Sequence, residues 1–133
     1  MQPPAERISI ETSDDLVGLR RCVRQAAVAM GFGPTDQVRL VTAASELARN
    51  IVLYADRGFA DISPVKRQGR RGLVVRFEDQ GQGISDIELA MQDGYTSGRG
   101  LGKGLPGARR LVDEFEIASQ VGLGTVVTIT KWL

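Results

Sequence analysis

The segment from residue 35 to residue 55 constrains the fold more than any other part of the chain. Its apolar residues recur at three- and four-residue spacing, which places them on one side of an α-helix. Thr35 and Asp36 stand at its start, where their side chains can cap the first turn. The apolar residues are Leu40, Val41, Ala44, Leu47, Ala48, Ile51, Val52 and Ala55. The segment therefore predicts a long helix that packs one side into a core.

The rest of the chain alternates between helical and strand-like stretches. Periodicity and turn residues predict further helices over residues 13–30, 85–92 and 105–112, the last with Pro106 in its first turn. Strands are expected over 7–11, 59–66, 73–77, 114–121 and 125–131, the last four as two hairpins. The glycine-rich segment 93–104 predicts a loop. Helices combined with antiparallel hairpins are typical of an α+β fold, a two-layer α/β sandwich with helices on one sheet face.

Composition sets the size and class of the protein. With 133 residues, of which 42% are hydrophobic, the chain is long enough for one core, so we expect a single domain over residues 1–133. The net charge of +1 removes the main electrostatic argument for binding nucleic acid or an anionic membrane. No apolar run approaches the roughly 18 residues of a membrane helix, and no export signal is visible. Cys22 is the only cysteine and cannot form an internal disulfide, which fits a reducing, cytoplasmic setting. Together these features lead us to expect a cytoplasmic protein that binds neither nucleic acid nor membrane.

The absence of histidine excludes several enzyme classes. A chain with no histidine cannot hold a Ser-His-Asp or Cys-His catalytic set or a histidine-bound metal. It also cannot phosphorylate itself on histidine.

Glu46 and Asn50 are four residues apart on the 35–55 helix and stack on one of its faces. The apolar residues centre nearly opposite, so we expect this face, with Ala43 between the two, to point away from the core. Taken alone, the pair is typical of a solvated helix surface. The functional alternative is that amide and carboxylate oxygens lie side by side where Mg²⁺ and a phosphoryl acceptor meet them, because Mg²⁺ prefers hard oxygen ligands.

Asp79, Gly81 and Gly83 form an Asp-x-Gly-x-Gly motif directly after an expected strand. A carboxylate at a strand end can accept a hydrogen bond from an exocyclic amine such as that of adenine, and glycines let a flat ring approach the backbone. A plain turn is the alternative interpretation.

The segment 96–107 is rich in glycine and carries Arg99 and Lys103. Free backbone amides at the start of a helix suit a polyphosphate. The segment does not match the dinucleotide fingerprint, because no strand immediately precedes it, nor the Walker A motif, because Gly104 follows Lys103 where Ser or Thr is required. A surface loop without a ligand is the alternative.

The order of four motifs resembles the GHKL ATP-binding family of gyrase, Hsp90-type chaperones, histidine kinases and MutL. These motifs are the Glu-x-x-x-Asn helix, the Asp-x-Gly-x-Gly turn, the Gly-x-Gly-x-Gly segment and a closing Gly-Thr. Residues 42–51, 78–84 and 100–107 look most like those of the RsbT-type serine/threonine switch kinases of bacterial stressosome partner-switching systems. The resemblance implies a Bergerat-type sandwich with a mixed, mainly antiparallel sheet.

The resemblance also implies roles for individual residues. Asn50 would help to hold Mg²⁺, Glu46 would be catalytic and act toward the acceptor hydroxyl, and Asp79 would bind adenine. Thr125 would support Asp79. The other implied nucleotide-binding residues are Gly81, Gly83, Gly98, Gly100, Leu101, Gly102, Lys103, Gly104 and Leu105.

The implied function is an ATP- and Mg²⁺-dependent serine/threonine protein kinase of a stress-response system. It would phosphorylate STAS-domain antagonist or scaffold proteins and, when released from them, activate a PP2C-type phosphatase. One alternative is a related anti-sigma factor kinase that sequesters a sigma factor. Another is a non-catalytic, ATP-dependent docking module that uses surface arginines, either Arg20, Arg21 and Arg24 or Arg70 and Arg71.

Overall fold

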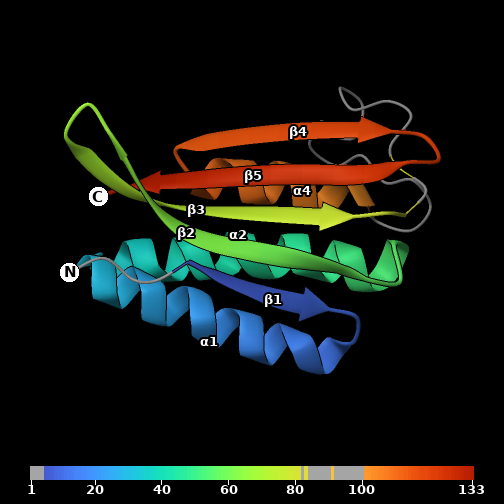
Figure 1. Ribbon diagram of the computed structural model, residues 1–133, viewed down its shortest axis with the longest axis horizontal. Coiled ribbons are helices and arrows are strands. Elements are labelled where there is room, and N and C mark those ends of the chain that lie inside the picture. Colours follow the sequence, from blue (N-terminus) through green and yellow to red (C-terminus); the bar gives the residue numbers. More distant parts are fainter. Residues whose placement is uncertain (1–4, 82, 84–90, 92–100) are drawn as a thin grey trace.

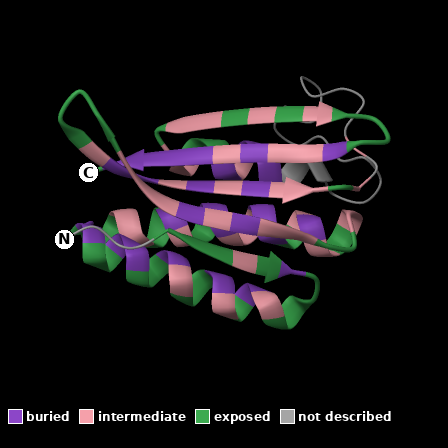
Figure 2. Ribbon diagram, in the orientation of Figure 1, coloured by how far each residue is buried: buried purple, intermediate pink, exposed green. Residues whose placement is uncertain are grey.

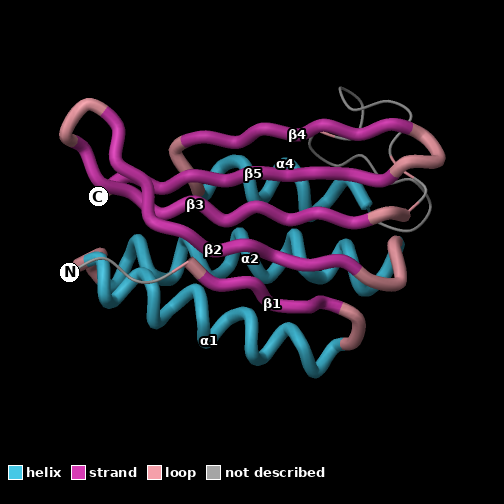
Figure 3. Tube along the Cα trace, in the orientation of Figure 1, coloured by secondary structure: helices cyan, strands magenta, loops and turns pink. Residues whose placement is uncertain are grey.

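The computed structural model describes residues 5–81, 83, 91 and 101–133, with only the backbone described for residues 101–103. Its described elements, in chain order, are β1 (Glu6–Ile10), α1 (Ser13–Met30), α2 (Pro34–Tyr54), β2 (Gly58–Arg67), β3 (Arg70–Asp79), α4 (Leu101–Leu111), β4 (Glu114–Gln120) and β5 (Gly124–Trp132). The three helices lie on one face of the sheet, and α2 lies between α1 and α4 (Figures 1 and 3). The predicted two-layer α+β sandwich is confirmed.

The described strands form one sheet in the order β1-β2-β3-β5-β4, and all four pairings are antiparallel. The β2–β3 hairpin is in register along its whole length, with Arg67 opposite Arg70 at its turn and Gly58 opposite Asp79 at its far end. Asp79 in turn lies opposite Thr125 of β5. This order brings the ends of β3 and β5 together at one edge of the molecule.

The core follows the two periodicities that the sequence predicts. On β3, Leu73, Val75 and Phe77 are buried and belong to the same core cluster as the buried helix residues. Figure 2 shows buried and partly buried positions alternating along the central strands. On the helices, the buried residues recur at three- and four-residue spacing. Burying each of the larger apolar side chains, such as Leu19 or Leu40, contributes on the order of 1.5–3 kcal/mol, so contact between the two layers supplies most of the stability of the individual helices.

Local signals determine where α1 ends and α2 begins. Gly31 takes a positive φ of 96° and ends α1, and Pro34 occupies the first turn of α2. The expected capping by Thr35 and Asp36 is wrong by a few residues, because Gly33 occupies the N-cap and makes no side-chain cap hydrogen bond. Proline at the first turn needs no hydrogen-bond partner for its nitrogen, so the helix begins at Pro34, before the position that a cap at Thr35 or Asp36 indicates.

The predicted start of the last helix is wrong. Residues 101–104, expected in a loop, form the first turn of α4, and Pro106 therefore lies inside the helix. Proline there removes the hydrogen bond to the carbonyl of Gly102 and is normally unfavourable. Leu105 and Ala108 are buried in the core, so packing against α2 holds a helix that the glycines and proline disfavour locally. The helix expected over 85–92 and most of the 93–104 loop lie outside the described residues.

Candidate functional site

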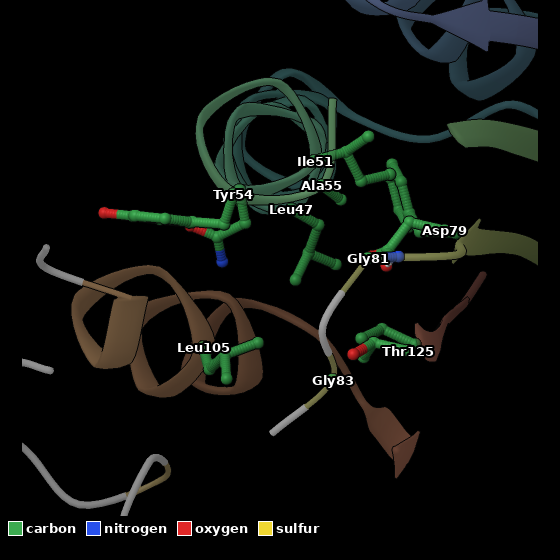
Figure 4. A pocket seen from close by; sticks show the side chains of 12 residues that line it. Leu47, Ile51, Tyr54, Ala55, Asp79, Gly81, Gly83, Leu105 and Thr125 are labelled. Atoms are coloured by element: carbon green, nitrogen blue, oxygen red, sulfur yellow. Dashed lines mark hydrogen bonds between the residues drawn. The ribbon is translucent and has the colours of Figure 1, made fainter. Parts of the chain in front are cut away.

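A pocket opens between the C-terminal half of α2, the beginning of α4 and the adjacent ends of β3 and β5 (Figure 4). Its floor is apolar and its rim carries polar side chains and glycine backbone. It is lined by Leu47, Asn50, Ile51, Tyr54, Ala55, Phe77, Asp79, Gly81, Gly83, Leu105, Thr125 and Val127. An apolar slot with a few convergent polar groups is the usual form of a small-molecule site.

Asp79 is the last residue of β3, and its carboxylate is about half buried in the pocket. Burial raises the pKa of this carboxyl above its ordinary value, and hydrogen bonds from the backbone amides of Gly81 and Thr125 oppose that rise. The Gly81 N–H donates to Oδ1 at 2.9 Å. These amides hold the carboxylate in one orientation, with acceptor capacity left for a ligand donor.

The glycines of the Asp-x-Gly-x-Gly motif are required by crowding. A Cβ on Gly81 would lie 2.8 Å from the Cβ of Ala55 at the end of α2. Gly83 has a φ of 78°, and a Cβ there would meet the carbonyl oxygen of Gln120. The backbone at Gly81 and Gly83 therefore packs directly against Ala55 and Gln120, with no room for a side chain.

Thr125 joins this site from β5, directly opposite Asp79. Its Oγ1 lies 2.8 Å from Oγ of Ser119, and the Ser119 hydroxyl also lies 3.0 Å from the Gly124 carbonyl oxygen, to which it can donate. A Cβ on Gly124 would meet the Asp79 carbonyl, so the β4–β5 turn closes directly against the end of β3. Figure 4 shows Thr125 and Asp79 on the same side of the pocket.

The face of α2 that carries Glu46 and Asn50 does not point away from the core, and that expectation is wrong. Ala43 is fully buried, and Nδ2 of Asn50 is buried with no hydrogen-bond partner among the described residues. The cause is α4, whose first turns pack on this face: a Cβ on Gly104 would lie 2.9 Å from Nδ2 of Asn50. The helical pattern of α2 alone could not show a second helix that packs through glycine and alanine.

Comparison with known proteins identifies the family to which this fold and pocket belong. Residues 11–131 match the model of the histidine kinase-like ATPase domain. The chain belongs to the histidine kinase-like ATPase family. It is 48% identical over 126 residues to the serine/threonine-protein kinase RsbT of Bacillus subtilis, and the match covers 95% of each chain. It is 31% identical over 115 residues to the anti-sigma F factor of Thermoanaerobacter sp. strain X514, covering 81% of this chain and 80% of that protein. This histidine kinase-like ATPase domain is a serine/threonine protein kinase of the RsbT type.

Two solved structures share the fold of the histidine kinase-like ATPase domain. The crystal structure of the RsbU and RsbW domains of Rv1364c from Mycobacterium tuberculosis superposes with a TM-score of 0.69 at 20% identity, covering 97% of this chain and 32% of that one. The mycobacterial sensor histidine kinase MprB superposes with a TM-score of 0.59 at 15% identity, covering 97% of both chains. At these identities the likeness concerns the fold.

The structure of this ATPase domain brings part of the expected nucleotide set together. Asn50, Asp79, Gly81, Gly83, Leu105 and Thr125 line the pocket. Glu46 is partly exposed one helical turn before Asn50, outside the pocket lining, and Gly104 is buried against Asn50. Leu101, Gly102 and Lys103 lie in the first turn of α4, and the expected positions Gly98 and Gly100 lie outside the described residues.

Several pocket residues of this ATPase domain were missed by sequence analysis. Tyr54 is four residues after Asn50 on α2 and so shares its face, a spacing that could have indicated it. Ser119 does not line the pocket but contacts Thr125, and it was missed because this contact depends on the β4–β5 register. The apolar walls appear in the sequence only as core residues; they are Leu47, Ile51, Ala55, Phe77 and Val127.

Two further kinds of feature are absent from the described residues of this ATPase domain. Among them, no cluster of three or more acidic or cysteine side chains is arranged to hold a metal ion. No helix in the described part of the chain is long and apolar enough to cross a membrane.

Proposed function

We propose that this RsbT-type kinase binds ATP with Mg²⁺ in the pocket and transfers the terminal phosphoryl group to a serine or threonine of a STAS-domain protein. The observation that carries the proposal is the half-buried Asp79 carboxylate beside a slot with apolar walls. The membership of the chain in the histidine kinase-like ATPase family and its similarity to RsbT independently support the use of ATP.

The residues of the pocket fit an adenine nucleotide. The ionised carboxylate of Asp79 is a pure acceptor, which suits the exocyclic amine of adenine. The walls formed by Ile51, Phe77 and Val127 suit the faces of a flat ring, and the backbone at Gly81 lets a ring approach closely. Thr125 adds a hydroxyl beside Asp79.

The residues also fit Mg²⁺ bound in part by the nucleotide. Asn50 supplies an amide whose nitrogen has no partner among the described residues, so the amide is free to turn its oxygen toward a ligand. Mg²⁺ often takes only one or two protein ligands and completes its shell with phosphate oxygens and water. When bound, Mg²⁺ neutralises charge on the phosphates. The residues from Gly98 to Leu105, the last of which form the start of α4, would cover those phosphates.

Glu46 is the proposed catalytic residue. It lies one turn from Asn50 on the same helix face and is partly exposed, so a partner protein can bring a hydroxyl to it. Its carboxylate would orient that hydroxyl and accept its proton as the oxygen becomes the nucleophile.

The proposed partners are STAS-domain antagonist and scaffold proteins and a PP2C-type phosphatase that the released kinase activates, in a cytoplasmic stress-response pathway that regulates a sigma factor or a second messenger. Similarity to RsbT supports this system. Similarity to anti-sigma F factors supports a second candidate, a kinase that sequesters a sigma factor.

Transfer of radiolabelled phosphate from ATP to purified STAS-domain proteins encoded beside this kinase tests the proposal, with EDTA and a STAS protein whose acceptor residue is changed to alanine as controls. We expect labelling that requires Mg²⁺ and the acceptor residue. ATP binding without transfer to any of these proteins would favour the docking module. Stable capture of a sigma factor by the same preparation would favour the anti-sigma candidate.

A further inference from the structure

The turn of the β2–β3 hairpin gathers positive charge at the end of the molecule opposite the pocket. Arg70 and Asp79 are the first and last residues of β3, so about 30 Å of strand separates the turn from the pocket. Figure 1 shows the hairpin projecting from the sheet at that far end. We define the hairpin patch as Lys66, Arg67, Arg70, Arg71 and Trp132.

The register of the hairpin places like charges directly opposite each other. Lys66 is the cross-strand partner of Arg71, and Arg67 is the cross-strand partner of Arg70. Like charges at such positions destabilise a sheet. The turn at Gln68 and Gly69, both with positive φ, fixes this arrangement, so slippage of the strands does not relieve the repulsion.

Only one cation of the hairpin patch is neutralised within the described structure. Arg67 pairs with Glu114 at 3.1 Å. Glu114 also accepts a hydrogen bond from Nε1 of Trp132, and these two contacts, the Trp132 bond first, lower its pKa. Lys66, Arg70 and Arg71 have no carboxylate within ion-pair distance among the described residues.

The largely buried Trp132 ring lies beneath two arginines of the patch. The guanidinium carbons of Arg67 and Arg70 lie 5.0 Å and 5.7 Å from the centre of its ring. The ring itself lies across Gly72, where a Cβ would be 2.7 Å from it. The two arginines are therefore held against a fixed surface with hydrogen-bond donors left over, which lowers the entropy cost of binding an anionic group.

We propose that the hairpin patch is a docking site for an acidic segment of a partner protein. Uncompensated cations on a preformed turn, with an aromatic ring beneath them, complement the carboxylates of an extended Asp- or Glu-rich segment. The patch is small and the net charge of the chain is +1, so it lacks the long basic track that nucleic acid requires. A partner bound here leaves the pocket uncovered. The proposal does not rest on the kinase function.

Trp132 is the only tryptophan of the chain, so its fluorescence reports on the patch directly. The probe is a short peptide of alternating glutamate and glycine, titrated into the full chain at low salt. We expect a saturable change in emission that added salt reverses. The double variant Lys66→Gln/Arg70→Gln should bind the peptide about tenfold more weakly, because it removes two charge-assisted contacts.

The matched control is Arg21→Gln/Arg24→Gln, which removes the same charge from the exposed face of α1 and should bind like the unmodified chain. The patch variant should unfold at the same or a higher temperature, because it removes cross-strand repulsion. If it fails to fold, Lys66→Gln alone carries the test.

Three outcomes would overturn the proposal. The first is that the unmodified chain does not bind the peptide. The second is that both double variants lose affinity equally. The third is that a single-stranded oligonucleotide binds the patch more tightly than the peptide does.

Discussion

Asn50 of α2 and Gly104 of α4 meet with no room for a side chain between them: a Cβ on Gly104 would lie 2.9 Å from Nδ2 of the Asn50 amide. The proposed metal ligand is therefore positioned by the helix that follows the glycine-rich segment. A shift of α4 would therefore displace the Asn50 amide, which couples the position of α4 to the pocket.

This contact predicts opposite effects for two glycine substitutions in α4. A Cβ on Gly107 meets nothing within 4 Å, so Gly107→Ala should stabilise the protein by about 0.5–1 kcal/mol, the usual helix preference of alanine. Gly104→Ala should lose that gain and weaken ATP binding, because its Cβ displaces Asn50. Urea denaturation of both variants measures the change in stability, and an ATP titration measures the change in ATP affinity. Equal behaviour of the two would show that the contact is unimportant.

Asp79→Asn should weaken ATP binding by about 1–3 kcal/mol, the range for a charge-assisted hydrogen bond. The amide can turn a donor toward the adenine amine, where only an acceptor is useful. Isothermal titration of ATP into the variant measures the loss, and circular dichroism checks its fold. Unchanged affinity in a folded variant would remove Asp79 from the base site.

The raised pKa of Asp79 predicts a pH dependence of stability. Its folded pKa lies above the unfolded value of about 3.9, so the folded state holds the proton more tightly. This contribution is fully present below the unfolded pKa and is lost as pH rises through the folded pKa. The unmodified protein should therefore lose stability relative to Asp79→Asn as pH rises from about 4, with a constant difference near neutral pH. Urea denaturation across this range measures it, and a difference independent of pH would contradict it.

Glu46→Gln should separate transfer from binding. It keeps the size of the side chain and removes the carboxylate, so phosphotransfer to a STAS partner should fall by roughly 10² to 10⁴ while ATP affinity holds. Asn50→Ala should instead reduce the Mg²⁺-dependent part of nucleotide binding. Radiolabel transfer beside a binding titration distinguishes the two variants. If the Glu46→Gln variant transfers phosphate as fast as the unmodified protein, Glu46 is not the catalytic base.

Thr125→Val should weaken ATP binding and cost about 1 kcal/mol of stability, because it removes the hydroxyl that Oγ of Ser119 contacts at 2.8 Å. Thr128→Val is the control, since Thr128 lies on the same strand, three residues further from the pocket end. Nucleotide titration of both variants should show loss only for Thr125→Val. A similar loss in both would point to a general effect on β5.

Sequence alone was sufficient wherever one element carries its own signal. The apolar spacing of α2 predicted the helix, residues 73–77 were predicted as a strand of a hairpin, and the motif order pointed to the family. Asp79 at a strand end followed by a glycine-containing turn was also predictable, because the Asp-x-Gly-x-Gly motif is a local signal. These features depend on neighbours in the chain.

Only the tertiary structure decided which face of α2 is covered and where α4 begins. Periodicity describes one helix at a time, so Ala43 and Asn50 looked exposed until α4 was seen to pack on them through Gly104. Local signals predicted that the last helix starts at residue 105 with Pro106 in its first turn, but α4 begins at Leu101, and burial of Leu105 and Ala108 outweighs the local preference. The pairing of Asp79 with Thr125 likewise depends on sheet order. Contacts between distant segments are determined by how the layers bury their apolar faces together, which no single stretch of sequence contains.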